Sequence, residues 1–148
     1  MTSQDPLSLA FDMARAAAAL GEVPVGAVVV RDGEVLGAAG NRTLTDRDPT
    51  AHAEVLAIRQ AAAKIGSERL IGCDLYVTLE PCAMCAGAIS FARLRRLYFA
   101  APDPKGGAVE FGPRFFSQPT CHHAPEIYGG IRESEAAELL RDFFKERR

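Results

Sequence analysis

Two short motifs constrain this chain more than any other feature, because together they make a set of metal ligands. The first is Thr50-Ala51-His52-Ala53-Glu54 and the second is Leu79-Glu80-Pro81-Cys82-Ala83-Met84-Cys85. They offer one imidazole, two thiols and a carboxylate. A catalytic zinc ion typically takes three protein ligands and keeps its fourth position for water, which leaves one acid free to move protons. The fold must therefore bring two distant segments to one point.

The spacing inside each motif favours the N-terminal ends of two helices. Cys82 and Cys85 lie three residues apart, on one face of a helix, and Pro81 suits a first helical position because its missing N–H costs nothing there. The positive end of the helix dipole favours thiolates. His52 and Glu54 converge only at a helix tip, where side chains lean toward the N-terminus. We therefore expect two helices whose N-termini point at one zinc ion.

The combination of motifs is more specific than either alone. Cys-x-x-Cys also occurs in redox pairs and structural zinc sites, and a lone histidine on an apolar helix is usually a packed core residue. Together the motifs match His-x-Glu…Pro-Cys-x-x-Cys, a pattern typical of zinc-dependent nucleobase deaminases. In this interpretation His52, Cys82 and Cys85 bind Zn²⁺, and Glu54 moves protons between water and the base.

Size and composition fit one globular domain and exclude several classes of protein. We interpret residues 1–148, of which 48% are hydrophobic, as a single domain. The net charge of −2 provides no global basic field for nucleic acid. We see no secretory signal, no apolar run of the ~20 residues that a membrane span needs, and no need for disulfides among the four cysteines. We therefore expect a cytoplasmic protein without a membrane segment.

Hydrophobic periodicity predicts helices and strands in alternation. Two strand-to-helix units in succession imply parallel strands with helices on the sheet faces, and such sheets present ligands at the carboxyl ends of their strands. Both motifs would then lie at one sheet edge. The expected elements are a helix capped by Asp5 or Ser3 and ended by Gly21, a hairpin over 23–40, a helix from Thr50 to Gly66, a strand over 73–79, a helix after Pro81, strands over 95–100 and 126–128, and a helix from Ser134.

The long stretch 101–125 is rich in proline and glycine, and loops of this length are often functional. Cys121, His122 and His123 lie within it and leave a rival hypothesis open. They could supply a fourth zinc ligand, which would make the zinc structural and exclude water. We favour the open site, because Pro-Cys-x-x-Cys deaminases use that water.

Longer segments of the chain resemble the bacterial tRNA adenosine deaminases of the cytidine deaminase superfamily. The segments that carry the resemblance are 21–28, 48–54, 79–88 and 143–148, whereas 110–116 and 120–123 look like a subgroup variant. The resemblance implies a three-layer α/β/α fold with a mixed five-stranded sheet, a homodimer, and zinc-dependent hydrolysis of adenosine to inosine at the wobble position (34) of a tRNA anticodon.

The resemblance also implies roles for individual residues. It implies the same zinc ligands, His52, Cys82 and Cys85, and the same proton-transfer role for Glu54. Further residues would contact the RNA: Asn41 reads the target base, Ala53 offers it a backbone contact, Val25 lines its pocket, Asp103 and Lys105 lie near the anticodon backbone, and Phe144 lies near the neighbouring nucleotides.

Two other functions stay open. The zinc motifs also fit a deaminase of a free nucleobase or nucleoside, such as guanine, cytosine or cytidine. A non-catalytic zinc-bearing RNA-binding subunit is the third possibility, and Glu54 argues against it. The whole-chain resemblance favours an anticodon stem-loop, supported by the basic and aromatic tail Phe143–Arg148. A base in that loop is already unpaired, so its extrusion costs little.

Overall fold

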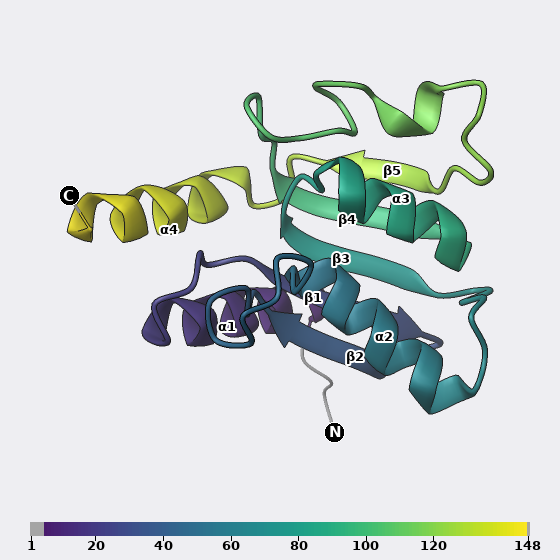
Figure 1. Cartoon of the computed structure of the whole chain (residues 1–148), viewed down its shortest axis with the longest axis horizontal. Helices are drawn as coiled ribbons and strands as arrows, with labels where there is room; N and C mark the ends of the chain where they lie inside the picture. Colours follow the sequence, from purple (N-terminus) through teal and green to yellow (C-terminus); the bar gives the residue numbers. More distant parts are fainter. Residues whose placement is uncertain (1–4, 148) are drawn as a thin grey trace.

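The computed structural model describes residues 5–147 and shows a five-stranded mixed sheet in the order β2-β1-β3-β4-β5 (Figure 1). Ser3 and Arg148 lie outside the described residues. The strands are β1 (Gly26–Arg31), β2 (Glu34–Gly40), β3 (Asp74–Leu79), β4 (Arg96–Ala101) and β5 (Glu126–Gly129). The helices are α1 (Pro6–Ala19), α2 (Ala53–Ile65), α3 (Ala83–Ala92), the short 3₁₀ helix η1 (Phe115–Ser117) and α4 (Glu133–Glu146).

The predicted hairpin over 23–40 is confirmed as β1 and β2. The turn is Asp32-Gly33, and both residues have positive φ, as a tight hairpin turn requires. Strand β1 is also antiparallel to β3, whereas β3, β4 and β5 are mutually parallel. Strand β2 therefore runs in the same direction as β3 and β4, and the carboxyl ends of all three lie at one edge of the sheet.

Helices cover both faces of this sheet, which confirms the predicted three-layer architecture. Helices α2 and α3 pack on one face, where Ala57, Leu75, Ile89 and Phe99 belong to one buried cluster. On the other face, α1 and the first turns of α4 cover a second buried cluster, which includes Phe11, Val28, Ala100 and Ala136. In Figure 1 the remainder of α4 extends away from the sheet.

Three predicted helix starts are wrong by one or two residues. Pro81 precedes the N-cap residue Cys82 and does not take the first helical position of α3. Thr50 does not cap α2, because its hydroxyl donates instead to Asp48 Oδ1 at 2.7 Å, and His52 occupies the N-cap position. Helix α4 begins at Glu133 rather than at Ser134. The predicted end of α2 is confirmed, since Gly66 adopts the left-handed conformation there. Within residues 5–147, none of the helices has the length and apolar character needed to cross a membrane.

Candidate active site

An imidazole and two thiols meet where α2 and α3 begin. His52 and Cys82 are the N-cap residues of the two helices, and Cys85 lies in the first turn of α3. His52 Nδ1 is 3.5 Å from Cys85 Sγ and 3.7 Å from Cys82 Sγ. Tetrahedral zinc with Zn–N and Zn–S bonds of ~2.1 and ~2.3 Å separates N and S by ~3.6 Å. The donor set and its spacing therefore fit a zinc ion.

The two thiols have opposite electrostatic preferences. The pKa of Cys82 is lowered to about 5 by a hydrogen bond from the Cys85 thiol, with further help from backbone N–H groups at the start of α3 and from His52, against the effect of burial. The pKa of Cys85 is raised by the same hydrogen bond and by burial. The pair therefore holds one proton, and binding of a metal ion would displace it.

Glu54 lies beside this group in the first turn of α2, and its side chain is only 4% exposed. Burial raises its pKa to about 7, and the nearby charge of Cys82 acts in the same direction. Among the described residues, the group of candidate metal ligands consists of His52, Cys82 and Cys85 and does not include Glu54. A carboxyl with this pKa is suited both to accept and to release a proton near neutrality.

Three residues predicted to form the base pocket are brought together by hydrogen bonds. The Asn41 N–H, just after β2, donates to the Val25 carbonyl at 3.1 Å. The Asn41 side-chain oxygen accepts the Ala53 N–H at 2.8 Å. Because that oxygen is engaged, the NH₂ group of Asn41 is the part that remains to recognise a base. The N–H of Ala53 is already paired with Asn41, so Asn41 is the stronger candidate for base recognition.

The structure also brings Lys105 and Phe144 together. They line one open hollow of about 920 Å³ with Leu140, Arg141, Lys145 and Arg147. Phe144 is 49% exposed while Phe143 is 7% exposed, so Phe143 packs inside and Phe144 remains at the surface. The Asp103 carboxylate accepts the N–H groups of Lys105 and Gly106 and closes a turn. Arg141 belongs to this hollow but was not recognised from the sequence.

The rival hypothesis of a fourth ligand from the long loop is not supported. The Cys121 thiol donates to the carbonyl of His123 at 3.2 Å, and His123 Nε2 lies 2.7 Å from the Leu94 carbonyl. These contacts, and that of Cys121 with Ser90, are at the C-terminal end of α3. The candidate metal ligands Cys82 and Cys85 are at its N-terminal end. Helix geometry therefore separates the two clusters, since each residue adds about 1.5 Å along the axis.

Two buried glutamates were not assigned a role from the sequence. Glu22 accepts the backbone N–H groups of Leu44 and Thr45 and the Thr45 hydroxyl, and so fixes the loop after Asn41. Burial alone raises the pKa of Glu22, but the hydrogen bonds from Thr45, Leu44 and Thr43 outweigh it and the net pKa is lowered. Glu80 has the same function for the loop after β4. The sequence signal that could have indicated these roles is a glutamate that stands next to apolar strand residues and a proline.

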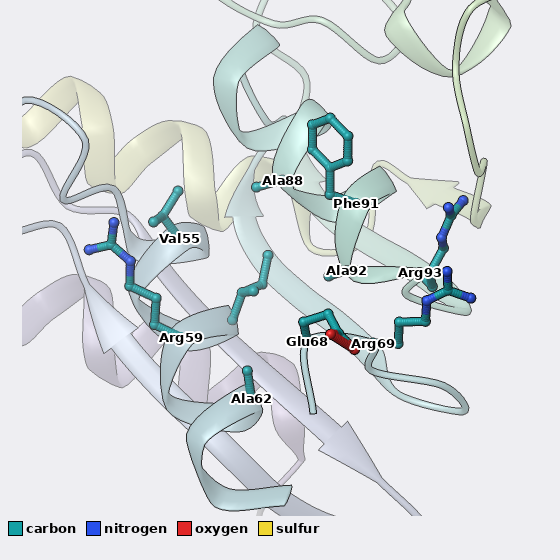
Figure 2. Close-up of a pocket in the computed structure, with 10 residues that line it drawn as sticks. Val55, Arg59, Ala62, Glu68, Arg69, Ala88, Phe91, Ala92 and Arg93 are labelled. Carbon is teal, nitrogen blue, oxygen red and sulfur yellow. The ribbon is translucent and has the colours of Figure 1, made fainter. Parts of the chain in front are cut away.

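A second hollow, of about 740 Å³, lies between α2 and α3 (Figure 2). Ile58 and Ala62 of α2 and Ala88 and Phe91 of α3 give it apolar walls. Phe91 is 65% exposed, which is unusual for a large aromatic side chain. This surface is therefore a candidate for contact with another protein chain.

Comparison with known proteins agrees with the geometry. Residues 1–148 match the family model described as MafB19-like deaminase. The chain belongs to this deaminase family. It is 63% identical over 142 residues to a tRNA-specific adenosine deaminase of Agrobacterium fabrum, covering 96% of this chain and 93% of that protein. The family resemblance and the enzyme class that we predicted from the sequence, a hydrolytic deaminase, are confirmed.

Solved structures extend the comparison to the fold. A structure from a study of A-to-I editing by tRNA:A34 deaminases at the wobble position matches this deaminase with a TM-score of 0.90 and 63% identity, covering 91% of this chain and 98% of that one. A guanine deaminase from Bacillus subtilis matches with a TM-score of 0.67 and 35% identity, covering 86% and 85%. The mixed-sheet deaminase fold is thus shared by proteins that act on different bases.

Proposed function

We propose that this deaminase converts adenosine to inosine at the wobble position (34) of a tRNA anticodon. The observation that carries the proposal is a buried carboxyl group, Glu54, beside a His-Cys-Cys group in a chain that matches a tRNA-specific adenosine deaminase over nearly its whole length. In the reaction water adds at C6 of adenine, the C6–N bond breaks, and ammonia leaves.

The proposal includes Zn²⁺ as the cofactor, with His52, Cys82 and Cys85 as its ligands. Two thiolates and a neutral imidazole balance the charge of the ion, and their spacing fits tetrahedral coordination. Zinc bound there supplies a Lewis acid that makes water a nucleophile near neutral pH.

The side chains around this group perform the remaining chemistry. Glu54 takes one proton from water and delivers it to N1 of the adenine. It later takes the remaining proton from the hydroxyl on C6 and delivers it to the departing amine. Its pKa of about 7 suits both directions of transfer. The NH₂ group of Asn41 donates to an acceptor atom of the base, and Val25 packs against the ring. The hydrogen bonds that join Asn41 to Val25 and Ala53 hold this pocket in place.

The hollow shared by Lys105 and Phe144 supports an RNA substrate. Its cations Arg141, Lys145 and Arg147 suit phosphates, and the exposed ring of Phe144 offers a face on which a base can stack. The local basic surface compensates for the overall charge of −2. Asp103 shapes the turn that presents Lys105 and acts on the RNA through it.

The experiment that tests this proposal is deamination of an anticodon stem-loop with adenosine at the wobble position, run beside free adenosine, guanine and cytidine. Zinc content is measured on the same preparation. We expect inosine in the RNA and no turnover of the free compounds. Turnover of guanine alone would replace the RNA substrate with a free base. A zinc-loaded protein without any turnover would favour the non-catalytic RNA-binding function.

The proposal extends to a homodimer and to the cytoplasm, where tRNA is the substrate. The apolar hollow between α2 and α3 is the candidate dimer surface, because the exposed Phe91 lines it (Figure 2) and Ile58 adds to its apolar wall. We expect light scattering to give twice the chain mass for the wild type and a monomer for Phe91→Glu. A monomeric wild type at micromolar concentration would contradict the dimer.

A further inference from the structure

Glu80 lies between the end of β3 and Pro81, and its side chain is only 2% exposed. One carboxylate oxygen, Oε1, accepts the N–H of Asp103 at 2.9 Å. The other, Oε2, accepts the N–H groups of Val109, Glu110 and Phe111 at 3.0, 3.0 and 3.2 Å. Within residues 5–147, every hydrogen bond recorded for this carboxylate comes from the backbone of one loop.

These hydrogen bonds hold both ends of the segment 103–111 with a single side chain. The start is fixed at Asp103 and the end at residues 109–111, so the segment forms a closed loop around the carboxylate. Lys105 lies at the exposed turn between the two fixed points. The N–H of Ala108 donates to the Pro81 carbonyl at 2.9 Å, which joins the same loop to the turn that carries Cys82.

Gly107 shows independently that the loop is built around Glu80. A Cβ atom at this position would overlap Oε2 of Glu80 and would lie 2.6 Å from the Asp103 carbonyl oxygen. Gly107 does not have a positive φ, so backbone conformation is not the reason for glycine here. The space that a side chain would fill is occupied by the Glu80 carboxylate and by the Asp103 carbonyl oxygen.

We propose that Glu80 is a positioning residue for the RNA substrate. It holds the segment 103–111 in the conformation that places Lys105 in the hollow shared with Phe144, and it couples this segment to the metal-ligand turn. The inference rests on the proposed function, because it assigns that hollow to the RNA. Glu80 does not itself touch the reacting atoms and acts through the loop.

Glu80→Gln is the direct test, because an amide keeps one acceptor oxygen and replaces the other with a donor. Whichever way the amide turns, one end of the loop loses its acceptor and faces an N–H group. We expect the KM for the stem-loop to rise about tenfold, as loss of one buried hydrogen bond implies. The kcat and the zinc content should stay within about twofold of the wild type, since the ligands and Glu54 are unchanged. Amide hydrogen exchange in the segment 103–111 should become faster.

Asp74→Asn is the matched control. Asp74 is a buried carboxylate at the opposite end of the same strand, where it accepts hydrogen bonds from Arg95 at 2.8 and 3.0 Å. We expect this variant to lose stability without a change in KM, because it does not contact the segment 103–111. Gly107→Ala is the second test, since it displaces the carboxylate without altering it. The double variant Glu80→Gln/Gly107→Ala should raise KM no more than the stronger single variant.

Several results would overturn the inference. Faster exchange in the loop with an unchanged KM would show that Glu80 holds a loop that does not position RNA. Loss of zinc with an unchanged KM would assign Glu80 to the metal site instead. An equal rise in KM for Asp74→Asn would show that the rise comes from general destabilisation of the fold. Multiplicative increases in KM in the double variant would show that Glu80 and Gly107 act independently. If the wild type does not deaminate the stem-loop at all, the proposed function fails and this inference fails with it.

Discussion

Replacement of Glu54 by Gln tests the proposed chemistry most directly, because it preserves the shape of the side chain and removes its ability to carry a proton. A positioned acid or base contributes roughly 10²–10⁴ to the rate of the step that it serves. Glu54 is assigned two proton uptakes and two deliveries in each turnover. We therefore expect kcat to fall by at least about 10³-fold, which corresponds to ~4 kcal/mol in the activation free energy.

The same substitution should leave metal binding and folding intact. The metal group consists of His52, Cys82 and Cys85, and Glu54 is not part of it. Burial raises the pKa of Glu54 to about 7, which means that its charged form is less stable in the fold than in water. Ionisation of Glu54 therefore lowers the free energy of unfolding as the pH rises above the unfolded pKa, and this loss reaches its full size above pH 7. Metal-free Glu54→Gln should therefore be more stable than metal-free wild type at pH 8, by up to about 3 kcal/mol.

The assay compares single-turnover deamination of the stem-loop with zinc content and with chemical denaturation of the metal-free proteins. His52→Ala is the contrasting variant, because it removes a ligand and should lose zinc and activity together. A zinc-loaded Glu54→Gln protein that turns over within tenfold of the wild type would refute the assignment of Glu54 as the proton-transfer group. Loss of zinc from Glu54→Gln would show instead that the carboxylate supports the metal.

Four further variants test the surrounding structure. Asn41→Asp keeps the acceptor for the Ala53 N–H but loses the NH₂ donors, so the melting temperature should hold while kcat/KM falls about tenfold or more. Phe144→Ala should raise the KM for RNA by about tenfold without lowering stability, because ~1.4 kcal/mol of stacking would be lost. Phe143→Ala should instead lower the melting temperature, because Phe143 is buried. The pKa of Glu22 is lower in the folded protein than in the unfolded chain. The Glu22 carboxylate therefore stabilises the fold above its unfolded pKa, and this stabilisation is lost as the pH falls through its folded pKa. The stability gap between wild type and Glu22→Gln, measured by urea unfolding, should therefore narrow from pH 7 to pH 3.

The features that could be predicted from the sequence have strong local signals. Asp32-Gly33 fixes the hairpin because a tight turn needs positive φ, and Gly66 ends α2 for the same reason. The convergence of His52 with Cys82 and Cys85 follows from two motifs that suit the same helix position and the same metal. Chemistry that requires several residue types at fixed spacing leaves few alternatives for the fold.

The features that could not be predicted depend on competition or on long-range contacts. Thr50 has the residue type of a helix cap, but Asp48 lies two residues away and captures its hydroxyl. The roles of Glu22 and Glu80 come from backbone N–H groups more than twenty residues further along the chain. No periodicity or local motif encodes such partners, because a loop's donors become available only when the whole sheet has formed.

The direction of β2 explains how these pieces become one site. The hairpin makes β2 parallel to β3 and β4, so the segments that begin with Asn41, Glu80 and Pro102 all leave the same sheet edge. The metal group is fixed by the starts of α2 and α3 at that edge, whereas the flanking loops are fixed by Glu22 and Glu80. A guanine deaminase shares this fold at a TM-score of 0.67. Because different residues fix the loops and the metal group, we expect the loops to decide between RNA and a free base as the substrate.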